Sequence, residues 1–452
     1  MISRSDQDQP KVVKKSPFFM VALAFLAVSL ACSFIIPFAT SESSVPTPNS
    51  PLGLIAYVGN DGNIYTTDRD GKQPNAITQD ANLNPVAGQA GRIYQYPAWA
   101  PDGQRLAFVR FSLSQSGQEV SLFSASSDGK NSVDTFTSQD FAPFYLSWSP
   151  NSQIIAFLGN DASGTLAQYL VAASGGESKF ISNGQPYYWD WSPDNHTLIV
   201  HIGGASSANP NARLAFIGLD GSNPKQELDL KPGSFEAPAW SPSGDVLALA
   251  TQNDAGDDEL ILAGRDGKVK QVLASLSGPV AFAWSPKGID LAYAVFEEAE
   301  LGPTIHLIVL DSARPDPQKQ VAQGKLVAFF WSPDGQKIAY FLLGGGEEDP
   351  LASSFQQVSQ ANPSASLIVR VYDRISGDTK EVATFAPTDS FQQILPFYSQ
   401  YQRSGTIWSP DSLNLVLSGV DSAGENAIYT VGADGSQFQK IADGNLAFWS
   451  WK

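Results

Sequence analysis

The chain has 452 residues, of which 42% are hydrophobic, and its formal net charge at pH 7 is −17. The hydrophobic content is enough for a buried core, whereas the negative charge argues against nucleic-acid binding, which needs clustered lysine and arginine. Cys32 is the only cysteine. The chain therefore contains neither an internal disulfide nor a metal site built from several cysteines.

The N-terminal region has the pattern of a membrane segment. Residues 1–17 carry an excess of basic side chains, and residues 18–39 contain no charged residue. At about 1.5 Å per helical residue, the second segment can cross the hydrocarbon core of a bilayer. The basic flank is expected to stay in the cytoplasm, which places the rest of the chain on the extracytoplasmic side of the cell membrane. Residues 40–51, rich in serine and proline, are predicted to be a linker.

Three interpretations of residues 18–39 are open. The first is an uncleaved signal-anchor helix that makes a single pass through the membrane. The second is a lipoprotein signal that ends at Cys32, where the preceding residues are Leu30 and Ala31. The third is a signal peptide that is cleaved in the usual way. The signal-anchor helix is the interpretation that we favour.

A Trp-Ser-Pro-Asp motif and its variants recur from residue 99 to the end of the chain. Successive copies are 41 to 77 residues apart. A period in the forties is typical of β-propeller blades. The motif also has the residues of a type I β-turn, with proline at the second position and, in several copies, glycine at the fourth. The tryptophans of the motif are Trp99, Trp148, Trp191, Trp240, Trp284, Trp331, Trp408 and Trp449.

Two strand signals accompany the motif. A short apolar run follows each turn, as in residues 106–109, and is bounded by turn residues. An alternating run that ends in a tight turn, usually Asp-Gly, comes later, as in residues 214–221. Together these signals predict four-stranded units with strands A to D, in which the tryptophan ends strand A. Eight motifs and eight hairpins predict an all-β, eight-bladed propeller, and seven blades is the alternative.

The two ends of the repeat region predict how the ring closes. The first unit begins with a strand B at Leu54 and lacks a strand A of its own. The last strand A, residues 446–449, has no strands after it. We therefore predict that this C-terminal strand completes the first blade, which would leave no unpaired terminal sheet.

These motifs resemble the TolB-type propeller repeats, a WD-repeat-like family with the consensus Trp-Ser-Pro-Asp-Gly-x-x-Ile/Leu-Ala-Phe/Tyr. Residues 331–340 match this consensus in full, and the resemblance covers residues 52–452. Asn151, Ser243 and Lys287 replace the aspartate of the turn, a change that turns tolerate. The resemblance implies an interaction module of the cell envelope, or a gating domain of the kind that is fused to peptidases.

Loop lengths distinguish the two faces of the predicted ring. The A–B and C–D turns are mostly tight and share one face, whereas the B–C and D–A connections share the other face and vary in length. Two insertions, residues 344–365 and 387–403, emerge on this second face, which we call the long-loop face. Binding functions concentrate on variable loops held by a rigid scaffold. We therefore predict that the long-loop face binds a protein, peptide or glycan partner.

Side chains near the long-loop end of the inner strands are candidates for the rim of a central pocket. Such a pocket could hold the end of a peptide or a sugar. The alternative is that the aromatic members of the set pack in the core between blades. The candidate rim residues are Tyr94, Gln95, Tyr187, Phe235, Glu236 and Arg403.

Motifs of catalysis and of cofactor binding are missing from the sequence. The three histidines, His196, His201 and His306, form no His-x-x-x-His pair. No Gly-x-Ser-x-Gly elbow and no phosphate-binding loop occurs. We therefore predict no catalytic residue, no cofactor and no metal ligand.

The function that the sequence favours is that of a non-catalytic, membrane-anchored β-propeller that binds partners at the cell envelope. One alternative is a propeller enzyme, a hydrolase or lyase that acts on envelope polysaccharide or peptide, because scattered carboxylates could gather around the central channel. Another alternative is a TolB-like subunit of a periplasmic complex.

Overall fold

The structure is a computed structural model that describes residues 53–452 except 162, 220–224, 235, 289, 298–303, 312–313 and 345–365. The predictions for residues 1–17, 18–39 and 40–51, and for Cys32, lie outside the described residues. So does nearly all of the predicted insertion at residues 344–365. Within the described part of the chain, no helix has both the length and the apolar composition that crossing a membrane requires.

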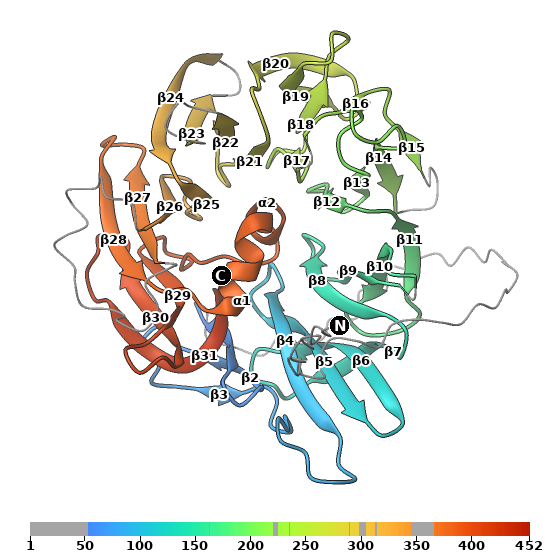
Figure 1. The fold of residues 1–452 in the computed structure, drawn as a ribbon, viewed down its shortest axis with the longest axis vertical. Helices are drawn as coiled ribbons and strands as arrows, with labels where there is room; N and C mark the ends of the chain where they lie inside the picture. Colours follow the sequence, from blue (N-terminus) through green and yellow to red (C-terminus); the bar gives the residue numbers. More distant parts are fainter. Residues whose placement is uncertain are drawn as a thin grey trace, which may run out of the picture. The chain divides into compact units, whose positions relative to one another are not determined.

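The described strands form seven antiparallel sheets arranged around a ring, the propeller architecture that the repeats predict (Figure 1). Strands that end in a motif tryptophan, such as β8, β12 and β25, lie toward the centre of the ring (Figure 1). Five sheets have four strands each: β4 (Gly91–Trp99), β5 (Arg105–Ser114), β6 (Gly117–Ser126) and β7 (Ser132–Ser138); β8 (Ala142–Trp148), β9 (Ile154–Asn160), β10 (Leu166–Ala172) and β11 (Lys179–Asn183); β12 (Tyr187–Trp191), β13 (Thr197–Ile202), β14 (Arg213–Gly218) and β15 (Gln226–Glu227); β21 (Val280–Trp284), β22 (Asp290–Glu297), β23 (Thr304–Asp311) and β24 (Arg314–Gly324); and β25 (Leu326–Trp331), β26 (Lys337–Leu343), β27 (Leu367–Asp373) and β28 (Thr379–Phe385). A five-stranded sheet contains β16 (Lys231–Pro232), β17 (Ala239–Trp240), β18 (Val246–Gln252), β19 (Asp258–Gly264) and β20 (Val269–Ser275).

The remaining sheet has six strands and joins the two ends of the propeller. Its order is β29-β30-β31-β1-β2-β3. The predicted closing pair is present, because Ile55 pairs with Trp449 and Val58 with Leu446. The first half of β31 pairs with β30. The strands are β1 (Ile55–Gly59), β2 (Ile64–Thr67), β3 (Asn75–Ala76), β29 (Asn414–Val420), β30 (Asn426–Gly432) and β31 (Gln439–Trp449).

The prediction of eight separate blades is wrong, and the alternative of seven matches the number of sheets. The eighth hairpin repeat is present as β29 and β30, and its strands are continuous with the sheet of the first repeat through β31. The reason is the length of β31, whose 11 residues continue from the last repeat into the first. Gly444 lies at the joint, opposite a register shift between Val58 and Gly59. A Cβ atom at Gly444 would lie only 2.6 Å from the Val58 carbonyl oxygen, so the close approach requires glycine.

The motif tryptophans connect each sheet to its neighbour. The indole N–H of Trp148 donates to the carbonyl oxygen of Ala98, one residue before Trp99 of the preceding sheet, at 3.0 Å. Trp99 donates to the carbonyl oxygen of Phe448 in β31 at 3.2 Å, which extends the series across the joined ends. The same bond is made by Trp284 to Ala239, by Trp331 to Ala283 and by Trp408 to Phe330. These five tryptophans therefore each donate to a backbone carbonyl of the preceding strand A. Trp191 donates instead to the Ser147 hydroxyl at 3.2 Å, and the indole nitrogens of Trp240 and Trp449 have no hydrogen-bond partner among the described residues.

The rest of the motif builds the turn between strands A and B. The N–H of Gly335 donates to the Ser332 carbonyl oxygen at 2.8 Å, as in a β-turn. The Ser332 hydroxyl donates to the Asp334 carboxylate at 2.5 Å and accepts from the N–H of Lys337 at 2.9 Å, where strand B begins. The fourth turn residue has a positive φ, 69° at Gly335 and 61° at Ser152. Glycine is therefore favoured there by backbone conformation, but another residue is accommodated.

Candidate functional site

A short helical segment occupies the centre of the ring (Figure 1). It consists of α1 (Asp389–Ile394), the 3₁₀ turn η2 (Leu395–Phe397) and α2 (Tyr398–Tyr401). Thr388 caps its start, because the hydroxyl oxygen accepts from the N–H of Phe391 at 3.2 Å. Phe391, Ile394, Leu395 and Tyr398 are buried. Their i, i+3, i+4, i+7 spacing gives the segment one apolar face. This segment is the predicted insertion at residues 387–403, folded back into the ring.

Aromatic contacts hold the apolar face of the helical segment against the sheets. The ring of Tyr398 packs edge-on against Phe329 of β25, with 5.2 Å between the ring centroids. The ring of Phe391 lies 5.7 Å from Phe341 of β26 and 6.3 Å from Phe385 of β28. These contacts fix the segment to the sheet formed by β25–β28.

Gln400 ties the helical segment to the inner strands β8 and β12. Its side-chain amide donates to the Trp189 carbonyl oxygen at 3.0 Å and to the Tyr145 hydroxyl at 2.9 Å. Its Oε1 accepts from the N–H of Trp189 at 3.0 Å. The Tyr145 hydroxyl donates to the Gln400 carbonyl oxygen at 2.8 Å. The Gln400 side chain therefore accepts from the N–H of Trp189 and donates to its carbonyl oxygen. Because both backbone groups are satisfied, no further strand can pair with β12 at this residue.

Arg403 anchors the end of the segment through a largely buried ion pair with Asp190, whose side chain is 16% exposed against 15% for Arg403. The Arg403 guanidinium also donates to the carbonyl oxygens of Ala237, at 3.3 Å, and Ser399, at 3.1 Å. The Asp190 carboxylate accepts in addition from the N–H of Trp240 at 2.8 Å. The pair therefore links the helical segment to both β12 and β17.

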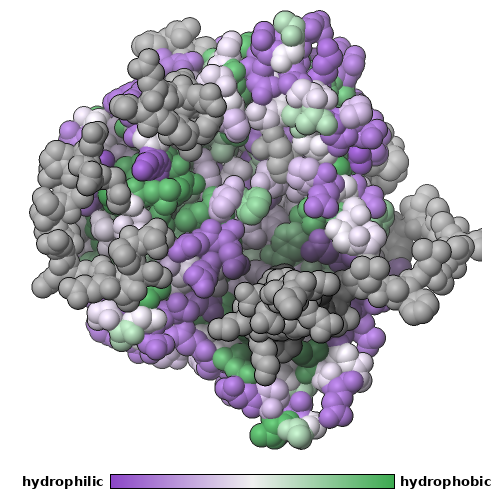
Figure 2. Space-filling model, viewed as in Figure 1, coloured by the Kyte–Doolittle hydropathy of each residue, from purple (hydrophilic) through white to green (hydrophobic). Residues whose placement is uncertain are grey.

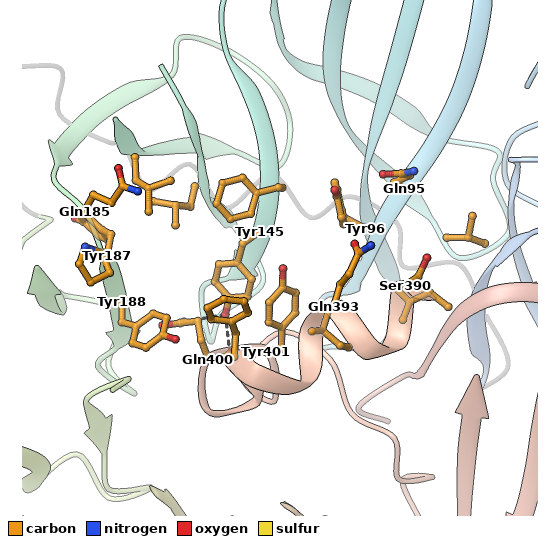
Figure 3. Close-up of a pocket in the computed structure, with 18 of the residues that line it drawn as sticks. Gln95, Tyr96, Tyr145, Gln185, Tyr187, Tyr188, Ser390, Gln393, Gln400 and Tyr401 are labelled. Carbon is orange, nitrogen blue, oxygen red and sulfur yellow. Dashed lines mark hydrogen bonds between the residues drawn. The ribbon is translucent and has the colours of Figure 1, made fainter. Parts of the chain in front are cut away.

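A cavity of about 570 Å³ opens between the helical segment and the inner strands β4, β8 and β12 (Figure 3). Its volume lies in the usual range of small-molecule sites, roughly 300–1,000 Å³. No Asp, Glu, Lys or Arg is found among the described residues of its wall. On the face of the ring that Figure 2 shows, hydrophilic residues lie at the centre with hydrophobic residues beside them. The aromatic side chains of the wall are Tyr96, Phe144, Tyr145, Tyr187, Tyr188, Phe397 and Tyr401, and the amides are Gln95, Gln185, Gln393, Gln400 and Asn445.

A second hollow, of about 360 Å³, lies at the Ser-Pro turns on the other face of the ring. Prolines and tryptophans of the motif form much of its wall, together with Gln402 and Arg403. The two preceding residues, Gln400 and Tyr401, line the first cavity. The helical segment therefore divides the central channel, and the first cavity opens on the long-loop face.

Tyr96 reaches the cavity from an unusual backbone position in β4. Its φ is 58°, a left-handed conformation that is rare for a bulky residue. The pairing of β4 with β5 shifts register between Gln95 and Ala98, as in a β-bulge. Burial raises the pKa of the Tyr96 hydroxyl. Backbone strain of this kind often marks a side chain that is positioned for a ligand.

Glu236, which precedes β17, and His201 of β13 form a buried polar pair. Glu236 is 1% exposed, and burial raises its pKa to about 8, against smaller opposite effects of the Ala250 N–H and Arg403. The two ring nitrogens of His201 lie 3.0 Å from the Glu236 carbonyl oxygen and 3.1 Å from that of Gly204. Burial also lowers the pKa of His201. Desolvation therefore favours the neutral form of both side chains.

The variant Glu236→Gln is expected to remove a pH dependence of stability. The carboxyl pKa is 4.5 in an unperturbed chain and about 8 in the folded protein, so the folded state holds the proton more tightly. The stabilisation is complete below the lower value and is lost as pH rises through the higher one. Between about pH 5 and pH 9, the wild-type protein should lose about 4 kcal/mol of unfolding free energy relative to Glu236→Gln, measured by urea denaturation. The exposed Glu425→Gln should follow the wild type, and parallel pH curves for all three proteins would contradict the protonated state of Glu236.

The structure separates the predicted rim residues. Gln95 and Tyr187 line the cavity, although the Tyr187 hydroxyl already donates to the side chain of Gln168 at 2.8 Å. Glu236 is buried and lines neither cavity, whereas Arg403 lines the second hollow and is paired with Asp190. Of these four residues, only Gln95 and Tyr187 therefore face the cavity.

Tyr94 lies apart from the cavity. It is 4% exposed, and its hydroxyl donates to the Asp80 carboxylate at 2.6 Å. The bulge in β4 explains the difference, because the register shift after Gln95 breaks the alternation and brings Tyr96 to the cavity instead. The remaining predicted residue, Phe235, lies outside the described residues.

Sequence reasoning missed the cavity residues of the helical segment, among them Gln393, Gln400 and Tyr401. The signal was present. A capping threonine followed by apolar residues at helical spacing predicts a short amphipathic helix. The segment was interpreted as a surface loop because of its position between two blades.

No family model matches the chain, and no curated protein matches it. Solved structures do. A eukaryotic initiation factor aligns with a TM-score of 0.50 and 11% identity over 88% of this chain and 98% of its own. An oligogalacturonate lyase in complex with manganese aligns with a TM-score of 0.49 and 14% identity over 85% and 96% of the two chains. TolB from Acinetobacter baumannii aligns with a TM-score of 0.34 and 19% identity over 57% and 61%. The resemblance to the TolB-type repeat family stays a prediction at these identities, and what the chain shares with the solved structures is the β-propeller fold.

Proposed function

We propose that this protein is a non-catalytic binding protein of the cell envelope. Residues 18–39 hold it in the cell membrane with the propeller on the extracytoplasmic side, and the cavity on the long-loop face binds an uncharged part of a protein, peptide or glycan. The observation that carries the proposal is the wall of the cavity, which combines aromatic rings and amides at the mouth of a channel closed by the helical segment. The resemblance of the repeats to those of TolB supports an interaction role at the envelope.

The chemistry of the wall supports binding rather than turnover. Hydrolases and lyases that act by general acid–base catalysis need positioned carboxylates or other proton-transfer groups of suitable pKa. The described wall of the cavity holds no carboxylate and no histidine. Asp190, which lies at the second hollow, is already paired with Arg403. A propeller hydrolase or lyase is therefore the less favoured function.

A pair of neighbouring substitutions tests the site. Gln393 and Gln392 are both exposed on α1, but only Gln393 lines the cavity. The variant Gln393→Trp should fill the cavity and weaken ligand binding at least roughly tenfold, the size of effect seen at interface hot spots. The variant Gln392→Trp adds the same side chain outside the cavity and should bind as the wild type does. The measurement is the ligand-induced shift in melting temperature of the full chain with panels of neutral oligosaccharides and of N-acetylated, C-amidated peptides.

The outcomes are distinct. A ligand whose affinity is unchanged in Gln393→Trp would show that binding occurs elsewhere on the protein. If neither panel shifts the melting temperature of the wild-type chain, the cavity has no ligand of the proposed type and the proposed function fails.

A further inference from the structure

The cavity contains polar groups that have no hydrogen-bond partner among the described residues. The side chains of Gln95, Gln393 and Ser390, and the hydroxyls of Tyr96 and Tyr401, make no hydrogen bond to any residue that the structure describes. In Figure 3, Tyr96 from β4 and Gln393 from α1 approach each other across the cavity, with Tyr401 beside them. A side-chain amide has both a hydrogen-bond donor and an acceptor, and the single oxygen of a phenol can both donate and accept. The matching ligand therefore carries groups that donate and accept, as hydroxyl groups do.

The same cavity offers apolar surfaces for a flat ligand. Phe397 is 48% exposed and lines the cavity, and Phe144 lines it as a half-buried side chain. Neither ring has a polar atom, so each can only pack against carbon. A sugar ring presents such a C–H face together with hydroxyl groups around its edge. The aromatic rings of the cavity match the C–H face of a sugar, and the amides and phenols beside them match its hydroxyl groups.

An extended peptide fits the cavity less well. Peptides commonly bind by adding a strand to a free sheet edge, but the backbone groups of Trp189 on β12 are already paired with the side chain of Gln400. A free peptide terminus is charged and would need an opposite charge, which the described wall lacks. The wall also holds no lysine or arginine for a uronate, and the chain carries a formal charge of −17.

From these contacts we infer that the ligand of the cavity is a neutral oligosaccharide. This inference rests on the proposed function and narrows its ligand class. Phe397 and Phe144 pack against the faces of the sugar rings. Tyr96, Gln393 and Tyr401 exchange hydrogen bonds with the hydroxyl groups. The backbone strain at Tyr96 has a role in this arrangement, because the left-handed φ of 58° accompanies the register shift that brings this phenol to the cavity.

The test is isothermal titration calorimetry of the full chain with defined probes. Cellotetraose, maltotetraose and chitotetraose represent neutral saccharides, tetragalacturonate represents an anionic one, and an N-acetylated, C-amidated tetrapeptide represents a neutral peptide. At least one neutral saccharide should bind, and more tightly than the anionic and peptide probes. Phe397→Ala and Tyr96→Phe should each weaken this binding roughly tenfold. The matched control is Phe180→Ala on β11, which removes a phenylalanine that is 50% exposed outside the cavity and should leave the affinity unchanged.

Each contrary result has its own meaning. Binding of the tetrapeptide without any saccharide would overturn the inference and leave the proposed function standing. Tighter binding of tetragalacturonate than of the neutral saccharides would overturn the neutrality of the ligand. Saccharide binding that is equal in Phe397→Ala, Tyr96→Phe and Phe180→Ala would place the site elsewhere. If no probe binds, the inference and the proposed function both fail. Melting temperatures of the variants show that any loss of affinity occurs in a folded protein.

Discussion

Deletion of residues 446–452 is expected to abolish cooperative folding of the propeller. The deletion removes the half of β31 that pairs with Ile55 to Val58 and the carbonyl that accepts from the Trp99 indole. Leu446, Phe448 and Trp449 are at most 5% exposed. Burying side chains of this kind contributes about 1.5–3 kcal/mol each, and the total stability of a domain is only about 5–15 kcal/mol. Circular-dichroism melting should show a broad transition at lower temperature in place of a single sharp one.

A matched control separates ring closure from a general effect of changing the C-terminus. Lys452→Ala changes only an exposed side chain and keeps every backbone contact, so its melting curve should follow the wild type. Hydrogen exchange should show loss of protection at residues 55–58 in the deletion variant only. A deletion variant that melts within a few degrees of the wild type would contradict closure of the ring through β31.

The substitution Arg403→Ala is expected to destabilise the protein by about 3 kcal/mol, because it leaves the largely buried Asp190 carboxylate without its cation. It also removes the hydrogen bonds to the carbonyl oxygens of Ala237 and Ser399. The helical segment should loosen as a result. Ligand affinity of the cavity should fall with it, since Gln400 and Tyr401 belong to the same segment. Urea denaturation measures the loss of stability.

Two comparisons identify the cause of this effect. Lys72→Ala breaks an ion pair with Asp70 in which the lysine side chain is 75% exposed. Because solvent screens this pair, its loss should lower the stability far less than Arg403→Ala does. The double variant Arg403→Ala and Asp190→Asn should be less destabilised than Arg403→Ala alone, because no unpaired charge remains in the wall. If Arg403→Ala costs no more than Lys72→Ala, the buried pair does not anchor the segment.

The strands and turns could be predicted because their signals are local. In residues 332–337 the serine, aspartate and glycine hydrogen-bond within the turn itself, so contacts within the motif are enough to stabilise the turn. The closing strand could be predicted because the first unit has no strand A of its own. The number of sheets could not, because it depends on whether residues 443–445 turn the chain or continue the strand. β31 continues through Gly444, which lies too close to the Val58 carbonyl oxygen for a side chain, and no local pattern shows that contact.

The candidate site was predicted only in part. Gln95 and Tyr187 follow from their place at the ends of inner strands, and both line the cavity. Tyr94 was predicted because it lies nearer the long-loop end of its strand, but the bulge in β4 brings Tyr96 to the cavity instead. The helical segment carries its own signal in the spacing of its apolar residues, but that signal predicts a helix and not its position.

By itself, the sequence determined the repeat, the antiparallel blades, the structural role of the tryptophan motif and the strand that joins the two ends. Hydrophobic periodicity and turn chemistry act over a few residues, so one blade at a time can be inferred from them. Only the tertiary structure decided that the insertion enters the channel and forms the floor of an uncharged cavity. The contact that places it, between Gln400 and Trp189, joins residues 211 positions apart. A hydrogen bond over that distance depends on the whole ring being assembled, and so lies beyond any pattern in the neighbouring sequence.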